Sequence, residues 1–209
     1  MENIVAFAVL GVFVAVVGYK YMKGRTAHQG VQQHLQAQPM LQAGAPLVDG
    51  SMVRVSGVVR PMQTVVAPLS GRVCVAYRTL ITHDVPSFRD MTQPNTAETF
   101  EMTPFMIDRG AEGPVIIDGS YAQLVVRSLH DSQLEMVNKE KFVLARGLSM
   151  REAVLARFSE TVIEAGMTVT VAGTLVSDGG MPGGTAGYRD GGQTVRLTGT
   201  PQAPLVIGA

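Results

Sequence analysis

The segment Val53-Arg-Val-Ser-Gly57-Val-Val59 is the most informative one for the fold, because its apolar side chains alternate as in a strand and its pattern returns later in the chain. The same V-x-V-x-G-x-[VL] pattern recurs at Val169-Thr-Val-Ala-Gly173-Thr-Leu175. A glycine inside a strand often marks a bulge or a sharp bend. Two such strands predict a mostly β fold, either a curled sheet or a small, partly open barrel of the OB kind. Chance similarity between two short β segments is the alternative.

Shorter elements are expected between and after these two strands. Alternation predicts a strand at 73–81, with Tyr77 pointing into the core and Arg78 towards the opposite face. The polar stretch at 83–104 is expected to be a long exposed loop. A capping-box pattern predicts one short helix near 149–157. Further strands are expected at 105–108, 114–118, 121–126, 194–200 and 205–208, with a hairpin at Asp118-Gly119.

The N-terminus carries an apolar run, Ile4 to Tyr19, of sixteen uncharged residues. As a helix it would span roughly 24 Å, and extension to Met22 brings it close to a bilayer core of about 30 Å. A cleaved signal peptide is the competing interpretation, but it requires basic residues before the run and a small-residue cleavage site after it. The sequence therefore predicts one uncleaved transmembrane helix within residues 1–25.

The charges beside this run predict its orientation. Lys20, Lys23 and Arg25 follow it, whereas only Glu2 precedes it. Because basic residues mark the cytoplasmic flank, we expect a single-pass membrane protein whose C-terminal domain is cytoplasmic. The single cysteine, Cys74, agrees with a reducing compartment.

Composition divides the remaining chain into a linker and one domain. Residues 26–50 are rich in glutamine and are expected to form a solvated linker, with any helix in it ending before Pro39, because proline ends helices. A coiled-coil or partner-binding stalk is the alternative. Residues 51–209 are long enough for one β domain. Three of the 17 basic and one of the 17 acidic residues precede Thr26, which leaves 14 basic and 16 acidic ones. This balance argues against a nucleic-acid partner.

No catalytic or metal-binding pattern stands out in the sequence. The four histidines are not spaced with Cys or carboxylates as metal ligands are, so no metal and no cofactor is expected. Cys74 is expected to be a small buried thiol. The glycine-rich stretch 179–192 lacks the end of a phosphate-binding loop and is expected to be a flexible connection.

The segment Ala67-Pro-Leu-Ser-Gly-Arg-Val-Cys-Val-Ala-Tyr-Arg78 resembles the signature of the GIDE domain, also called the beside-a-membrane (BAM) domain, of membrane E3 ubiquitin ligases. Similar blocks follow in order at 117–122, at 160–173 and at 204–207. The resemblance covers about residues 51–207. It assigns a structural role to the following signature residues: Pro68, Leu69, Ser70, Gly71, Cys74, Tyr77, Asp118, Gly119, Glu160, Gly166 and Gly173.

The sequence departs from this family in lacking the RING, whose zinc sites need eight Cys or His ligands. The resemblance therefore implies a membrane-anchored binding or scaffold module that recruits a protein partner, without catalysis of its own, and Arg78 is the candidate contact residue. Two alternatives stay open. One is an enzyme of the E3 ubiquitin transferase family, and the other is a structural membrane protein.

Overall fold

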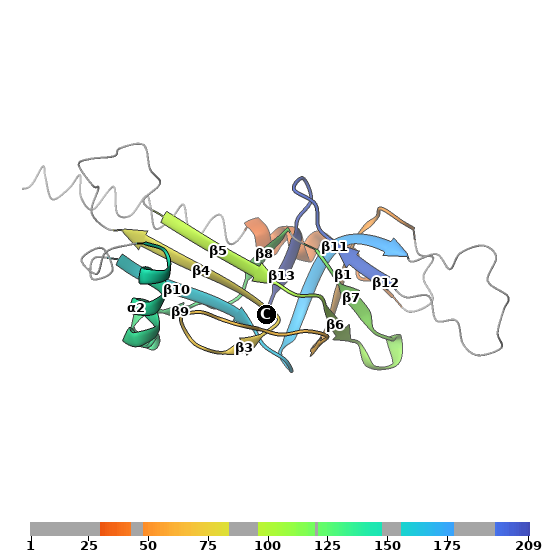
Figure 1. Ribbon diagram of the computed structural model, residues 1–209. Helices are drawn as coiled ribbons and strands as arrows, with labels where there is room; N and C mark the ends of the chain where they lie inside the picture. The colour runs from red at the N-terminus through yellow and green to blue at the C-terminus, as the bar shows by residue number, and fades with distance from the viewer. Residues whose placement is uncertain (1–29, 43–47, 84–95, 120, 148–155, 178–194) are drawn as a thin grey trace, which may run out of the picture.

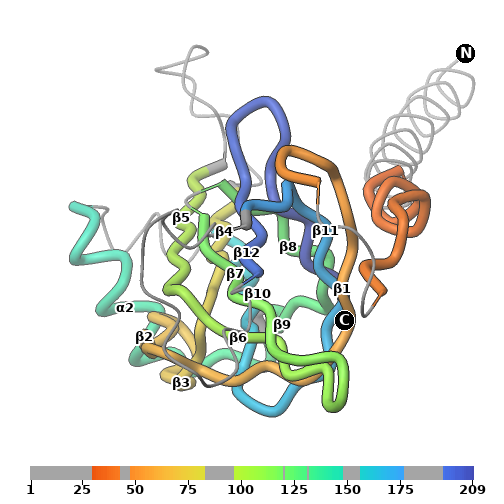
Figure 2. Tube along the Cα trace, turned by 90° about the vertical axis from the view of Figure 1, so that its right-hand side faces the viewer, coloured from red at the N-terminus to blue at the C-terminus, as the bar shows by residue number. Residues whose placement is uncertain are grey.

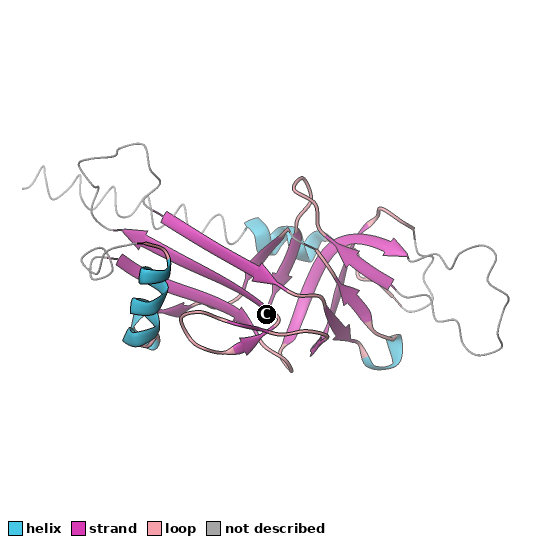
Figure 3. Cartoon of the chain, in the orientation of Figure 1, coloured by secondary structure: helices cyan, strands magenta, loops and turns pink. Residues whose placement is uncertain are grey.

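The computed structural model describes residues 30–42, 48–83, 96–119, 121–147, 156–177 and 195–209. These residues are mostly β, with two short helices (Figure 3). The expected anchor at 1–25, the glycine-rich stretch 179–192 and the capping box at 149–152 lie outside the described residues. Within the described part, no helix is both long enough and apolar enough to cross a bilayer.

Five strands form a closed barrel at one end of the molecule (Figure 1). Their order is β1 (Met52–Pro61), β6 (Phe105–Asp108), β7 (Val115–Ile117), β12 (Val195–Thr198) and β11 (Thr168–Ser177). The circle closes because β1 pairs with β6 along one edge and with β11 along the other. The expectation of a partly open barrel was therefore wrong, since closure leaves neither β1 nor β11 as an edge strand.

The two repeated segments of the sequence pair directly with each other. β1 and β11 run antiparallel, with Val53 opposite Gly173 and Gly57 opposite Val169. Each glycine also lets a third strand approach. A Cβ on Gly57 would lie 2.3 Å from the carbonyl oxygen of Asp108, and one on Gly173 would lie 2.4 Å from Leu205 Cδ2. The glycines thus permit the crowded bends that the pattern predicted.

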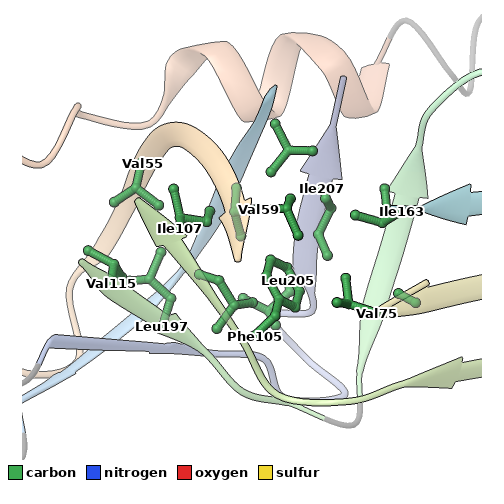
Figure 4. Close-up of a cluster of buried hydrophobic side chains, with 14 of the residues drawn as sticks. Val55, Val59, Val75, Phe105, Ile107, Val115, Ile163, Leu197, Leu205 and Ile207 are labelled. Carbon is green, nitrogen blue, oxygen red and sulfur yellow. The ribbon is translucent and has the colours of Figure 1, made fainter. Parts of the chain in front are cut away.

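The barrel encloses the largest cluster of buried apolar side chains among the described residues (Figure 4). Valines and isoleucines from β1, β6, β7 and β11 belong to this cluster, together with Leu197 of β12 and the fully buried ring of Phe105. Such β-branched side chains suit a pleated, enclosed surface. The side chains labelled in the close-up are Val55, Val59, Val75, Phe105, Ile107, Val115, Ile163, Leu197, Leu205 and Ile207.

Two further strands and an N-terminal helix pack around β11. β13 (Leu205–Gly208) pairs with β11 and, in parallel, with β8 (Ala122–Val125). Residues 30–37 are helical and run beside the barrel, which faces the viewer in Figure 2. Leu35 of this helix is only 6% exposed and packs against Val125 and Val206. The expected linker is therefore helical before Pro39 and largely exposed where it is described, but Leu35 and Leu41 attach it to the domain.

The other end of the molecule is a four-stranded sheet. Its order is β5 (Thr96–Met102), β4 (Ala76–His83), β10 (Ala156–Ile163) and β9 (Leu129–His130). Helix α2 (Met136–Ala145) covers one face, where Ile81, Val143 and Phe158 form a second core. The small hairpin of β2 (Val65–Val66) and β3 (Val73–Cys74) lies below it (Figure 1). Single 3-10 turns occur at Gly110–Glu112 and Asp131–Gln133.

Two local predictions were wrong, and one helix was missed. The stretch 83–104 was expected to be a loop, but β5 occupies its second half. The strand was missed because polar and apolar residues are mixed in its sequence. Helix α2 was not predicted, and of the helix expected near 149–157 only Ala156 and Arg157 lie within the described residues, where they begin β10. Asp118-Gly119 does not form a hairpin, since β7 pairs with β6 and β12 while β8 pairs with β13.

Candidate functional site: the sheet lobe

The sheet lobe consists of β4, β5, β9, β10, helix α2 and the β2–β3 hairpin, and it contains the signature segment. Residues Pro68 to Gly71 form the turn between β2 and β3. Gly71 has a φ of +68°, a conformation that side chains disfavour, and its N–H donates to Ala67 O at 2.9 Å. The predicted need for glycine at this position is confirmed.

A buried carboxylate holds this turn in place. Oε1 of Glu160 accepts the backbone N–H of Leu69 at 2.9 Å, and Oε2 accepts that of Ser70 at 2.8 Å. The hydroxyl of Thr79 lies 3.2 Å from Oε1. Glu160 is fully buried on β10. Two blocks of the signature, ninety residues apart between Ser70 and Glu160, therefore meet in one contact.

Helix α2 fixes the turn from the other side. Nδ2 of Asn138 donates to the carbonyl oxygen of Leu69 at 3.0 Å. The peptide groups at Leu69 thus have their donor and their acceptor satisfied by side chains from β10 and α2. Because buried backbone groups without partners are costly, these contacts allow the loop to be packed inside the lobe. Glu160 serves this purpose and is not placed as a proton donor or acceptor for a substrate.

The thiol of Cys74 is buried beside the same contact. Its Sγ lies 3.7 Å from the carbonyl oxygen of Val65, and the residue is 1% exposed. Burial, and next the negative charge of Glu160, raise the pKa of Cys74 to about 11. The thiol is therefore protonated at neutral pH, which makes it a poor nucleophile and metal ligand. The prediction of a buried thiol is confirmed.

Tyr77 points into the lobe, as predicted, and is 7% exposed. Its hydroxyl donates to Oε2 of Glu101 on the neighbouring strand β5 at 2.7 Å. Burial, followed by this hydrogen bond, raises the pKa of Tyr77 to about 12. Both Cys74 and Tyr77 thus keep their protons because ionisation would place a charge inside the lobe, close to existing carboxylates.

Arg78 lies on the opposite face of the sheet, also as predicted. Its Nε and Nη2 donate to the two carboxylate oxygens of Glu98 at 2.8 and 3.0 Å, which is a bidentate ion pair across β4 and β5. The two side chains are 40% and 48% exposed. Arg78 is therefore accessible to a partner but held in one orientation by Glu98.

The remaining signature residues lie in the barrel lobe, which consists of the five barrel strands with β8 and β13, and they do not join this site. Asp118 accepts a hydrogen bond from Nη1 of Arg196 at 3.0 Å, linking β7 to β12. A Cβ on Gly119 would lie 2.9 Å from Gly199 N, and Gly166, at the β10–β11 turn, has a φ of +82°. With Gly173, these residues shape the barrel.

Sequence reasoning missed the partners of the signature residues. Glu98, Glu101 and Asn138 lie in segments whose elements were not predicted, so no cross-strand register could be drawn. Among the described residues, no three His, Cys, Asp or Glu side chains gather as a metal site would require.

Comparison with protein-family models, with curated proteins and with solved structures found no match. Function is therefore inferred from the residues and their geometry.

Proposed function

We propose that the protein is a single-pass, membrane-anchored scaffold that binds a protein partner on the cytoplasmic side through its sheet lobe. The observation that carries this proposal is the ordered, accessible ion pair of Arg78 and Glu98 on the sheet face opposite helix α2. An arginine with fixed geometry suits recognition, because little side-chain freedom is lost when it binds.

The chemistry of the lobe supports binding in preference to catalysis. Three of its side chains with reactive groups, Glu160, Cys74 and Tyr77, are buried and hydrogen-bonded to the lobe itself. The resemblance to the GIDE domain points in the same direction, since that domain is the recruiting module of its ligases. The closed barrel serves in this proposal as a rigid support.

The membrane part of the proposal comes from the sequence. A reporter fused after Ala209 should show a cytoplasmic C-terminus, because the basic residues follow the apolar run. A reporter active only on the other side of the membrane would contradict this topology. Metal analysis should find no stoichiometric zinc, and about one equivalent per chain would contradict the non-RING assignment.

Partner binding is tested with a matched pair of variants in the full-length, detergent-solubilised protein. Arg78→Ala removes the proposed contact, and Arg60→Ala removes a similar exposed arginine, paired with Asp108 at 3.2 Å in the barrel lobe. Affinity capture with quantitative mass spectrometry should recover a protein with the wild type and Arg60→Ala, and lose it with Arg78→Ala. Equal recovery by both variants would refute Arg78 as the contact.

A further inference from the structure

We infer that the outer edge of β5 binds an extended segment of a protein partner by strand addition, and that this segment carries two basic side chains three positions apart. The inference rests on the proposed function, because it assigns a binding mode and a partner chemistry to the same lobe. It shares Glu98 with the Arg78 contact but adds the backbone edge of β5, so hydrogen exchange at that edge and the Arg78→Ala capture experiment can fail separately.

β5 is the terminal strand of its sheet (Figure 1). It pairs with β4 over seven consecutive residues, and no described strand pairs with its other side. Proteins usually protect such an edge with charged side chains, above all lysine, or with proline, a bulge or a very short strand. The sequence of β5, Thr-Ala-Glu-Thr-Phe-Glu-Met, contains neither lysine nor proline, and its register with β4 has no interruption.

The backbone groups that would accept a new strand can be identified from the register. The N–H of Thr103 donates to Val75 O at 2.9 Å, in the same antiparallel register as β4 and β5. Successive residues of a strand direct their backbone groups to alternate sides. The backbone N–H and C=O groups of Thr99 therefore face β4, whereas those of Glu98 and Phe100 face outward.

The charges on β5 identify the partner. Glu98 and Glu101 are both exposed, project from opposite faces of the sheet, and are the only charged residues between Thr96 and Met102. The groups that face them from β4 are Arg78, which pairs with Glu98, and Tyr77, which donates to Glu101.

These contacts come from the inner side of β5, so basic side chains of an added strand can reach both carboxylates from the outer side. Residues three apart in a strand point to opposite faces, and opposite charges across strands are favourable. An extended segment of the form basic-x-x-basic therefore matches this edge.

The edge is also rigid before any partner binds. β4 is paired on both sides, with β5 and with β10, and its side chains Tyr77 and Thr79 are buried. A preformed edge supplies main-chain hydrogen bonds at little ordering cost, as in known cases of strand addition.

Hydrogen exchange of the full-length protein in detergent tests the binding mode. The probe is the capped peptide Thr-Lys-Val-Thr-Lys-Val-Thr. At about ten times its Kd, exchange of the Glu98 and Phe100 amides should slow about tenfold, while the already bonded Thr99 amide should change little. The same peptide with both lysines replaced by glutamate should give no protection. Unchanged exchange at Glu98 and Phe100 overturns the proposal, as does equal protection by the acidic peptide.

Two substitutions at one position separate the backbone from the side chain. Glu98→Pro removes the outward N–H, which β4 does not use, and Glu98→Ala removes only the carboxylate. Peptide affinity should fall at least about tenfold with proline and about threefold with alanine. Equal affinities for the two variants would overturn strand addition. If Glu98→Pro does not fold, the exchange experiment on the wild type still decides. Loss of the captured protein with Arg78→Ala but no peptide effect would leave the scaffold function standing and refute the β5 edge alone.

Discussion

The barrel lobe and the sheet lobe are both made of strands, but different interactions hold them together. The barrel is filled by apolar side chains from all of its strands. By contrast, the four buried polar or charged residues among those described all lie in the sheet lobe, namely Thr79, Lys139, Glu160 and Thr161. The stability of the barrel should therefore depend mainly on the size and shape of its side chains. The stability of the sheet lobe should depend mainly on their charges and hydrogen bonds.

The reason for this difference is the closure of the strands. In a closed barrel, neighbouring strands satisfy the backbone groups, so side chains need only fill space. In the sheet lobe a turn is packed inside the structure, and its N–H groups need a side-chain acceptor. Glu160 provides it at the cost of burying a carboxylate.

The largest effect is expected from removing that acceptor. Glu160→Ala leaves the N–H groups of Leu69 and Ser70 without partners and should lower the free energy of unfolding by about 4 kcal/mol. Glu160→Gln can accept only one of them and should cost about 2 kcal/mol. Urea unfolding followed by circular dichroism measures both. A cost below about 1 kcal/mol for alanine would show that the turn does not depend on this contact.

A single methyl group should disrupt the barrel almost as much. Gly57→Ala places a Cβ 2.3 Å from a backbone oxygen that cannot move without opening the pairing of β1 with β6, and it should cost about 3 kcal/mol. Gly208→Ala is the control, because its Cβ would meet the end of the flexible Leu35 side chain at 2.8 Å, and it should cost about 1 kcal/mol. Similar unfolding midpoints for the two variants would contradict the argument from backbone crowding.

Alkaline pH should weaken the sheet lobe selectively. Folding raises the pKa of Cys74 to about 11 and that of Tyr77 to about 12. Above the unfolded-state pKa values of about 8.5 and 10, the unfolded chain loses these protons before the folded chain does. The stabilisation is therefore complete below about pH 8.5 and is lost up to about pH 12, on the order of 2 kcal/mol for each group.

Variants without these two ionisable groups test the source of the pH dependence. The double variant Cys74→Ala, Tyr77→Phe should show a flatter decline of stability over the alkaline range. Tyr121→Phe, at a tyrosine that is 49% exposed, should leave the decline unchanged. A decline as steep in the double variant as in the wild type would assign the alkaline loss to other groups.

The smallest effect is expected at Arg78. Arg78→Ala breaks an exposed ion pair and should cost roughly 0.2–1 kcal/mol, whereas Tyr77→Ala, one residue away on the buried face, should cost roughly 3–5 kcal/mol. Thermal melts of both variants give the comparison. If Arg78→Ala melts as early as Tyr77→Ala, then Arg78 is a structural residue and the proposed contact surface is wrong.

The sequence predicted those parts of the molecule in which local pattern and burial agree. The repeated valine–glycine segments predicted the curved strands β1 and β11, and the alternation around Tyr77 predicted which face of β4 is buried. Closure of the barrel could not be predicted, because it depends on the register between two strands far apart in the chain. That register becomes visible only when Val53 is found opposite Gly173.

The sequence was least informative in the sheet lobe. β5 was read as a loop because Glu98 and Glu101 interrupt its apolar pattern, yet both carboxylates have partners on β4. Helix α2 has only Lys139 and Val143 buried, so its apolar stripe is too weak to detect. The signature residues could be recognised, but the role of Glu160 as acceptor for the turn required the three-dimensional contact.

The pairing of β1 with β11 also sets the order of events when the chain folds. Ser56 and Val169, which are hydrogen-bonded across these strands, are separated by 113 positions. During synthesis, the edge of β1 that pairs with β11 stays uncovered until more than a hundred further residues have been made, so the new chain exposes this edge of a valine-rich strand for many seconds. Such long-range pairing makes barrel closure a slow step. Chaperone dependence and aggregation during expression should therefore follow from this one strand pair, even though the finished barrel is well packed.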